Sequence, residues 1–150
     1  MDNSLKGLLL AAGVIITCIV VSLGFYISRE ANAAATSGVG QISRMNKEIS
    51  ESDKSMYDGL VVTGAEVINA IKKNRKEDVA VVVETKKAGR VSYNRVLSGD
   101  DSSIGGESSA SVVEAQNITN NNYINQNAQF VGTVIRDVND TIIAIKFVQE

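Results

Sequence analysis

The 150-residue chain has no histidine, no proline and no tryptophan, and its one cysteine is Cys18. Without histidine, the chain has neither imidazole metal ligands nor a histidine general base. One cysteine cannot form an intrachain disulfide or supply the thiolate cluster that zinc or an iron–sulfur centre needs. These absences argue against most enzymes, so we expect no catalytic residue, no cofactor and no metal.

Positive and negative charges are nearly balanced. Lys plus Arg is 15 against 17 for Asp plus Glu, a net charge of -2, so we expect no nucleic-acid partner. The basic residues of 72–76 have no aromatic platform, and the spacing in Asp100-Asp101-Ser102-Ser103 does not match an EF-hand loop. The composition therefore predicts a membrane-linked structural or binding protein.

One long apolar run dominates the N-terminal part. Residues 7–27 read GLLLAAGVIITCIVVSLGFYI, 21 positions without a charged side chain. As a helix this segment is about 31 Å long, which matches the hydrocarbon core of a bilayer. A cleaved signal peptide would have a shorter apolar region, and the run continues past Cys18, which argues against lipidation there. We predict a membrane-spanning helix that contacts lipid.

The flanks of the span indicate its orientation weakly. Lys6 and the terminal amine precede the span and are offset by Asp2, while Arg29 and Glu30 follow it. A head of six residues is easily left in the cytoplasm. We therefore predict a single-pass protein with a cytoplasmic N-terminus, residues 1–7, and an extracytoplasmic bulk.

An amphipathic pattern continues the apolar run to about residue 57. Apolar or small residues recur every seven positions, and small residues within the span permit close helix approach. We predict one long helix over 8–57 that packs against partner helices; packing on its own head domain is the alternative interpretation. The candidate packing residues are Gly7, Ala11, Gly13, Val14, Val21, Gly24, Ala35, Ile42 and Ile49.

The remaining chain, 58–150, is predicted to form an α+β head. After a stop at Tyr57-Asp58-Gly59, Thr63 and Glu66 have the spacing of a capping box, which predicts a short second helix over 64–73. Asn74 is a candidate left-handed cap of that helix.

From residue 79 onward, the pattern of apolar residues is typical of strands and not of helices. Val79–Thr85 and Arg90–Val96 flank a turn and predict one hairpin, and Phe130–Val138 and Thr141–Val148 predict another around Asn139-Asp140. We predict a small antiparallel sheet of about four strands, packed on the short helix.

The segment 98–127 between the hairpins is predicted to be a flexible loop. Its first part, 98–111, is rich in Ser, Gly and Asp, and 117–127 is rich in Asn. Asn side chains can stack as ladders in β-rich assemblies, but a solvated surface loop is the favoured interpretation.

This order of segments resembles type IV pilin-like proteins and pseudopilins. The resemblance covers the whole chain as architecture, and its motif support is Lys6-Gly7 with the apolar run. It implies that a prepilin peptidase cleaves the leader after Gly7, that the helices pack into a filament core, and that the sheets form the outer surface. Ala12 would be the fifth mature residue, where most bacterial members carry a Glu that pairs with a neighbour's N-terminal amine.

Two functions of different classes follow. The first is a structural subunit of a pilus-like filament or pseudofilament, a homo-oligomer that assembles through its N-terminal helix with assembly machinery. The alternative is a single-pass accessory protein whose β-rich head binds a surface or transporter partner, with an auxiliary subunit of a larger membrane machine as a weaker variant. A mature N-terminus at Leu8 or at Met1 discriminates between filament subunit and anchored protein.

Overall fold

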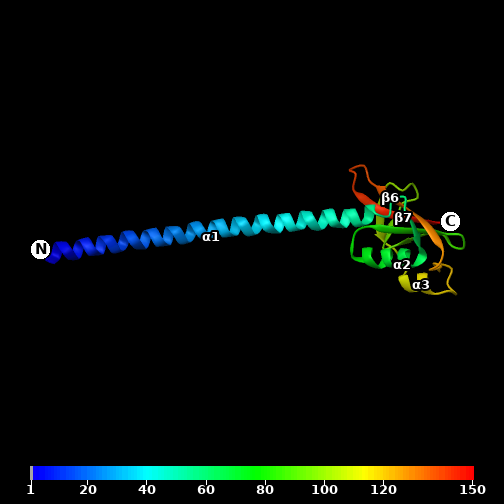
Figure 1. Cartoon of the computed structure of the whole chain (residues 1–150), viewed down its shortest axis with the longest axis horizontal. Coiled ribbons are helices and arrows are strands. Elements are labelled where there is room, and N and C mark those ends of the chain that lie inside the picture. Colours follow the sequence, from blue (N-terminus) through cyan, green and yellow to red (C-terminus); the bar gives the residue numbers. More distant parts are fainter. Residues whose placement is uncertain (1) are drawn as a thin grey trace. The chain divides into compact units, whose positions relative to one another are not determined.

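The computed structural model describes residues 2–150, which divide into two compact units, one ending at Glu48 and the other comprising Ile49–Glu150. Helix α1, Asp2–Ser55, is 54 residues long (Figure 1). It begins earlier than the predicted 8–57 boundary, so residues 2–7 are helical, and Met1 lies outside the described residues. The absence of proline permits this length, and Gly59 with φ +71° follows its end.

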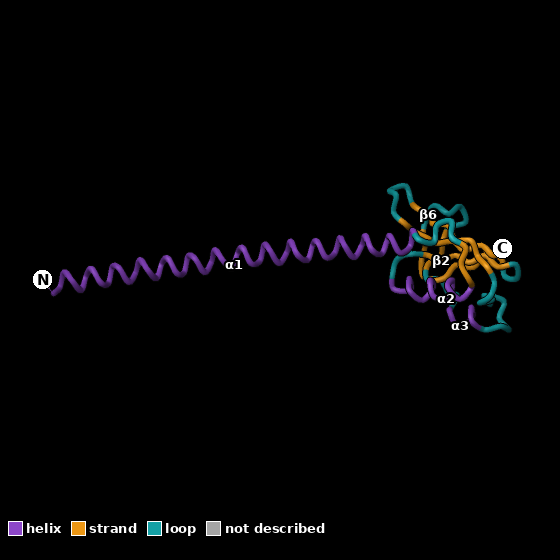
Figure 2. The backbone as a smooth tube through the Cα atoms, viewed as in Figure 1, coloured by secondary structure: helices purple, strands orange, loops and turns teal. Residues whose placement is uncertain are grey.

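The unit Ile49–Glu150 contains two sheets and two short helices beyond the end of α1 (Figure 2). The strands are β1 Val61–Thr63, β2 Ala80–Thr85, β3 Gly89–Tyr93, β4 Arg95–Leu97, β5 Ile104–Glu107, β6 Gln129–Arg136 and β7 Ile142–Gln149. The helices are α2 Gly64–Lys73, the 3₁₀ turn η1 Asn74–Lys76, and α3 Val112–Gln116. The α+β class is as predicted.

The main sheet differs from the predicted one. It has five strands in the order β1-β6-β7-β2-β3, and β4 with β5 forms a second, two-stranded sheet. Both predicted hairpins, β2–β3 and β6–β7, are confirmed as antiparallel pairs, but β2 pairs with β7 in parallel. The prediction of a purely antiparallel sheet is therefore wrong. The parallel pairing joins the two most apolar strands at the sheet centre, where both faces are covered.

The predicted strand 90–96 is interrupted at Asn94. Asn94 has φ +65°, and its side chain donates to the carbonyl of Ile71 at 3.1 Å. This left-handed residue ends β3 and turns the chain into β4, which pairs with β5. Strand β5 and helix α3 lie within 98–127, so that segment is not a loop throughout.

The turn between β6 and β7 is longer than the predicted two-residue turn. The Asp137 carboxylate accepts from the N–H groups of Asn139 at 2.8 Å and Thr141 at 2.9 Å, and Asp140 has φ +62°. The bond from Thr141 is the largest cause that holds the pKa of Asp137 below its usual range. The Asp137 side chain thus organises the turn.

Two apolar clusters cover the faces of the main sheet. Alternate residues of β2 enter different clusters, since Val81 and Val83 belong to the larger one and Ala80 and Val82 to the smaller. The larger cluster includes α2, with Val67, Ile68, Ile71, Tyr93, Ile124, Phe130, Ile145 and Phe147. The smaller lies under β4 and β5, with Leu97, Ile143 and Ala144 buried and Ile104 and Ile135 packed against them. The head therefore has three layers.

Helix α2 spans the predicted residues, and its capping box is present. The Thr63 N–H donates to Glu66 Oε2 at 3.0 Å, and the Glu66 N–H donates to Thr63 Oγ1 at 3.4 Å. Asn74 is not a left-handed cap, because its φ is −86° and its ψ 6°. Its buried side chain instead donates to the Ala70 carbonyl at 2.8 Å, which allows the chain to continue into η1.

The Asn-rich segment 117–127 is a mostly exposed loop without helix or strand, as expected, but one of its residues belongs to the core. Ile124 is fully buried, and its N–H donates to Ala115 at 2.8 Å. The residue after this segment contacts the start of α2, since the Gly64 N–H donates to the Ala128 carbonyl at 2.9 Å. One buried isoleucine and the pairing with α2 therefore order a stretch whose composition resembles a loop.

Gly64→Ala is expected to destabilise the head. A Cβ at Gly64 would collide with the backbone carbonyl of Asn125, whereas one at Gly106 meets nothing within 4 Å. We expect Gly64→Ala to lower the free energy of unfolding by about 1–3 kcal/mol. The measurement is thermal or denaturant unfolding of the full chain in detergent. Gly106→Ala is the control, and equal midpoints for the two variants would contradict the close contact.

Candidate assembly surface on the N-terminal helix

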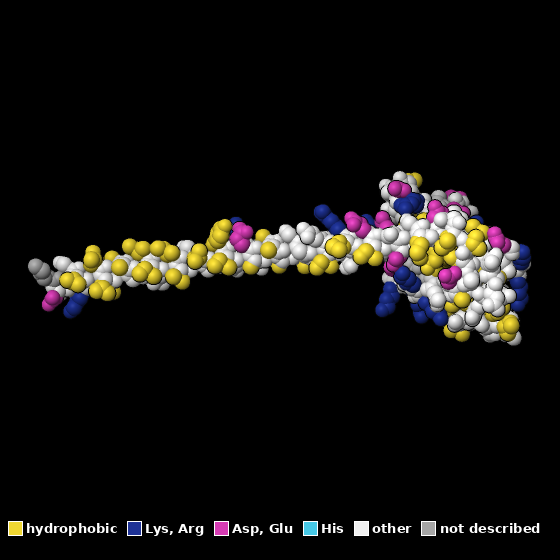
Figure 3. Space-filling model, viewed as in Figure 1, with side chains coloured by type: hydrophobic (Ala, Val, Ile, Leu, Met, Phe, Trp, Pro, Cys, Tyr) yellow, Lys and Arg dark blue, Asp and Glu magenta, His cyan; other side chains and the backbone are white. Residues whose placement is uncertain are grey.

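The apolar span is exposed along its whole length. Every residue of 7–27 is exposed, with Leu8 at 74% and Phe25 at 70%. Figure 3 shows hydrophobic side chains along this half of α1, with charged groups mainly outside it. Within residues 2–150, α1 is the one helix long and apolar enough to cross a membrane, by length and composition. Lipid or protein must cover this surface.

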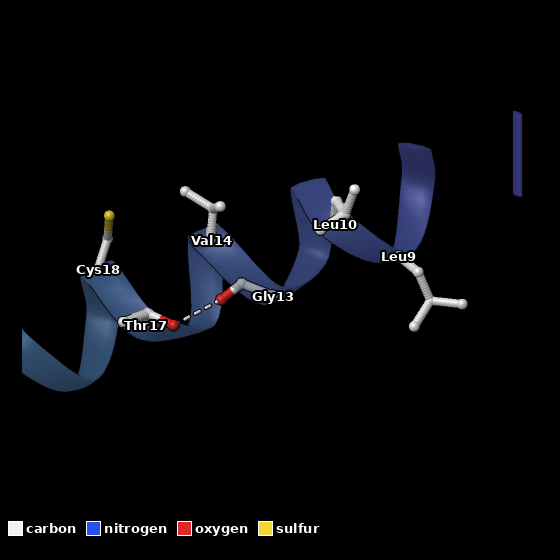
Figure 4. A pocket seen from close by; sticks show the side chains of 6 residues that line it. All are labelled: Leu9, Leu10, Gly13, Val14, Thr17 and Cys18. Carbon is white, nitrogen blue, oxygen red and sulfur yellow. Dashed lines mark hydrogen bonds between the residues drawn. The ribbon is translucent and has the colours of Figure 1, made fainter. Parts of the chain in front are cut away.

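A shallow notch lies on the span. Leu9, Leu10, Gly13, Val14, Thr17 and Cys18 line it (Figure 4). Leu10, Val14 and Cys18 project from one side of the helix, whereas Leu9 points away from them. The Thr17 hydroxyl donates to the Gly13 carbonyl at 2.8 Å, so this polar group is satisfied inside the helix. A notch of this kind suits a neighbouring helix that approaches at a small residue.

The nine candidate packing residues do not share one face of α1. At 3.6 residues per turn, one set falls within about 40° of arc: Gly13, Gly24, Ala35, Ile42 and Ile49. The other set falls within about 80° of arc, centred about 100° away: Gly7, Ala11, Val14 and Val21. We call the first set the straight face. It joins small residues in the span to branched residues beyond it.

Beyond the span, α1 is cleanly amphipathic. Val39, Ile42, Met45 and Ile49 are between 57% and 65% exposed, and we call them the α1 stripe. The charged residues of the same stretch lie about 160° around the helix from the stripe: Arg44, Lys47, Glu48 and Glu51. The stripe is thus a second apolar surface without a partner among the described residues.

Polar side chains fix the end of α1 to the head. Lys54 forms an ion pair with Glu77, and the Ser50 hydroxyl donates to Glu77 Oε2 at 3.0 Å. Lys54 also donates to Ser50 Oγ at 2.9 Å. We call Ser50, Lys54 and Glu77 the clamp. Lys54 is 8% exposed, so these partners offset the cost of burying its ammonium group.

Two further contacts support the clamp. Lys73 at the end of α2 pairs with Asp53 at 2.7 Å, an exposed contact that is worth little by itself. The Tyr57 ring packs edge-on against Phe147, with centroids 5.4 Å apart and planes at 80°. Ile49 and Met56, in contrast, remain exposed. The head therefore contacts the polar side of these turns and leaves the stripe side open.

The clamp and its neighbour shift two pKa values. The hydrogen bond from Lys54 is the largest cause that lowers the pKa of Glu77 from its ordinary 4.5. The hydrogen bond to Asp53 is the largest cause that raises the pKa of Lys73. Both shifts favour the charged forms, so the clamp is an ionic contact at neutral pH.

Other polar groups of the head are satisfied internally. Asp100 accepts from the hydroxyls of Ser98 and Ser102, which lower its pKa to about 2. Burial raises the pKa of Tyr93 to about 12, and its hydroxyl donates to the Asn122 carbonyl at 3.1 Å. Within residues 2–150, no group of three or more metal-ligating side chains is present. The α1 surfaces are therefore the main candidates for a functional site.

Comparison with protein families, with curated proteins and with solved structures finds no match to this chain. The pilin-like resemblance therefore stays a hypothesis, and the candidate site depends on geometry alone.

Sequence reasoning missed the clamp. Ser50 and Glu77 are 27 positions apart, and no local pattern joins them. The buried lysine gave no signal either, because Lys54 sits among other charged residues of an amphipathic helix. The division of the packing residues into two faces, in contrast, follows from helix periodicity, and plotting them at 100° per residue would have revealed it.

Glu77→Gln is expected to destabilise the head, because it leaves the Lys54 ammonium without its anion. We expect a loss of about 1–3 kcal/mol at pH 7. Since folding lowers the pKa of Glu77, its contribution is complete above 4.5 and is lost as the pH falls through the folded value. The two proteins should therefore converge in acid.

This effect is measured by denaturant unfolding of the full chain between about pH 3 and about pH 7. Glu107→Gln is the control, because Glu107 is exposed and forms no ion pair with any residue of the described chain. A stability for Glu77→Gln that matches the control at neutral pH would show that the clamp contributes nothing.

Proposed function

We propose that this protein is a structural subunit of an extracytoplasmic filament or pseudofilament, assembled through α1. The observation that carries the proposal is the fully exposed apolar span, whose straight face continues outside it. A chain that functioned as an isolated anchored monomer would need the span for lipid but would not need the exposed stripe beyond it.

Different forces support packing in the two halves of α1. Within lipid, apolar burial gives no net drive, so close van der Waals contact at Gly13 and Gly24 is the main contribution. Outside lipid, Ile42 and Ile49 leave water when a surface of another copy covers them, which adds hydrophobic free energy. Together these surfaces favour other copies of this chain as partners, with lipid covering the span before assembly.

The resemblance to pilin-like proteins adds a processing step to the proposal. Cleavage after Gly7 by assembly machinery would remove the cytoplasmic leader and expose Leu8 as the new N-terminus. Since α1 includes Lys6 and Gly7, this step requires the first turns of the helix to unwind. Helix ends fray readily, so such unwinding has a low cost.

A second candidate is a single-pass accessory protein whose head binds a surface or transporter partner. Ala12 favours it, because the carboxylate that most pilin-like proteins carry at this position is absent. This candidate keeps residues 2–7 in the mature chain and leaves the protein in the membrane.

Electron microscopy of material sheared from expressing cells tests the proposal, with an antibody to the C-terminal head as label. Labelled filaments are the expected result. A head that stays in washed membranes with no labelled filament would overturn the filament function and support the accessory candidate.

Gly13→Leu should abolish the labelled filaments while the protein still inserts in the membrane. The leucine would fill the notch at which neighbouring helices approach. Ile19→Phe is the control, because Ile19 lies about 120° from the straight face and about 80° from the second set. Membrane fractionation checks insertion, and filaments of normal yield from Gly13→Leu would contradict packing at the straight face.

Mass spectrometry of the mature N-terminus gives an independent test. The filament proposal with processing expects Leu8 as the first residue, and Gly7→Leu should block its appearance. A mature chain that retains residues 2–7 would exclude the processing step and favour the anchored accessory protein.

A further inference from the structure

The main sheet leaves part of one face uncovered. Val61, Val131 and Val148 are directly opposite one another across β1, β6 and β7, so their side chains share a face. Val61 is 50% exposed and Val148 38%, whereas their neighbours Val62, Phe130 and Phe147 are buried on the α2 side. The β4–β5 sheet covers the other part of this face. We call the three valines the valine row.

No unpaired charge interrupts the valine row. Glu84 continues the row on β2, opposite Val148, and it pairs with Lys146 at 2.9 Å. Thr133 lies beside them. A partner that covers the row would thus bury three valines and a neutral ion pair, without an isolated charge.

The open edge beside the row is blocked to an added strand. The Val134 N–H donates to Asp58 Oδ1 at 3.1 Å, and the Thr63 N–H donates to Glu66 Oε2 at 3.0 Å. These carboxylates occupy donors that an incoming strand would need, and they place negative charge at the edge. A partner must therefore dock on the face of the sheet and not along its edge.

The uncovered part of the face has the width of one helix. Three strands span about 10 Å, which is close to the diameter of an α-helix with its side chains. An apolar stripe free of charge is what such a helix must present. Within residues 2–150, the α1 stripe is the amphipathic helix face that has no partner.

The last turns of a copy's own α1 cannot fill this place. The clamp and Tyr57 hold them on the side of Phe147, which belongs to the α2 side of the sheet. Ile49 lies about 100–140° around the helix from Ser50 and Lys54, so it faces away from its own head. The occupant is therefore a different chain.

We propose that the valine row of one copy binds the α1 stripe of a second copy, an inference that rests on the filament function proposed above. Each copy has one stripe and one valine row, and the two surfaces differ. Such a contact is heterologous, and it repeats without closing unless the rotation forms a ring. A filament is the open result.

The contact is too small to hold two chains in free solution. Three valines and a helix stripe bury far less than the roughly 800 Å² per partner of a stable interface. Anchoring both chains by their spans raises their effective concentration and allows a weak contact to form. The stripe–row contact therefore adds direction to an assembly whose main attraction lies in the spans.

Site-specific cross-linking in membranes tests this inference with the full chain. In a Cys18→Ser background, a chain with Val148→Cys is co-expressed with a differently tagged chain carrying Ile42→Cys, and a short bismaleimide is added. The expected product is a mixed dimer with both tags. The control pairs Val148→Cys with Lys47→Cys, which lies about 140° from Ile42 on the helix, and should give no mixed dimer.

Two further variants separate this contact from filament assembly itself. Chains that carry only Ala35→Cys, on the straight face but outside the stripe, report helix–helix packing, and their cross-linking without the mixed dimer would overturn the stripe–row contact but leave the filament function standing. Absence of both products would overturn both proposals. Val61→Lys, with unchanged head unfolding, should abolish the mixed dimer, and a mixed dimer that survives it would also overturn the contact.

Discussion

The constraint on which the rest depends is that 21 consecutive uncharged residues of α1, 7–27, are all exposed. Water cannot cover this surface at acceptable cost, so lipid or a protein partner must. The head forms its core without this span, because its two apolar clusters contain no residue that precedes Tyr57. Assembly and folding of the head are thereby separate problems.

Polar side chains join the end of α1 to the head. If the end of α1 packed on the head through Ile49, this residue of the α1 stripe would be buried within its own chain. The clamp instead uses Ser50 and Lys54, which lie on another side of α1, together with Glu77 of the head. A buried ion pair adds little net stability, yet it is strongly directional and costly to break. It thus fixes the end of α1 while its apolar stripe stays open.

Local patterns sufficed for part of this fold. Helix α2 and its capping box depend on residues within one turn, and each hairpin depends on neighbouring apolar runs, so the sequence predicts them. The parallel β2–β7 pair joins segments about sixty positions apart, and no local pattern encodes it. Asn94 and Ile124 show the same limit, since composition indicates neither the left-handed residue that interrupts a strand nor the one side chain that a loop buries in the core.

The period of α1 also bears on how its copies can pack. A seven-residue repeat drifts by about 20° per heptad on a straight helix, so packing along it requires a left-handed supercoil. Gly13, Gly24 and Ala35 recur instead at eleven positions, a period of about 3.67 residues per turn that stays nearly straight and favours a slight right-handed twist. Ile42 and Ile49 fall on the same arc. Close approach at small residues therefore favours nearly straight neighbouring helices as far as Ala35, whereas the larger side chains of Ile42 and Ile49 keep helix axes further apart and can contact a second surface.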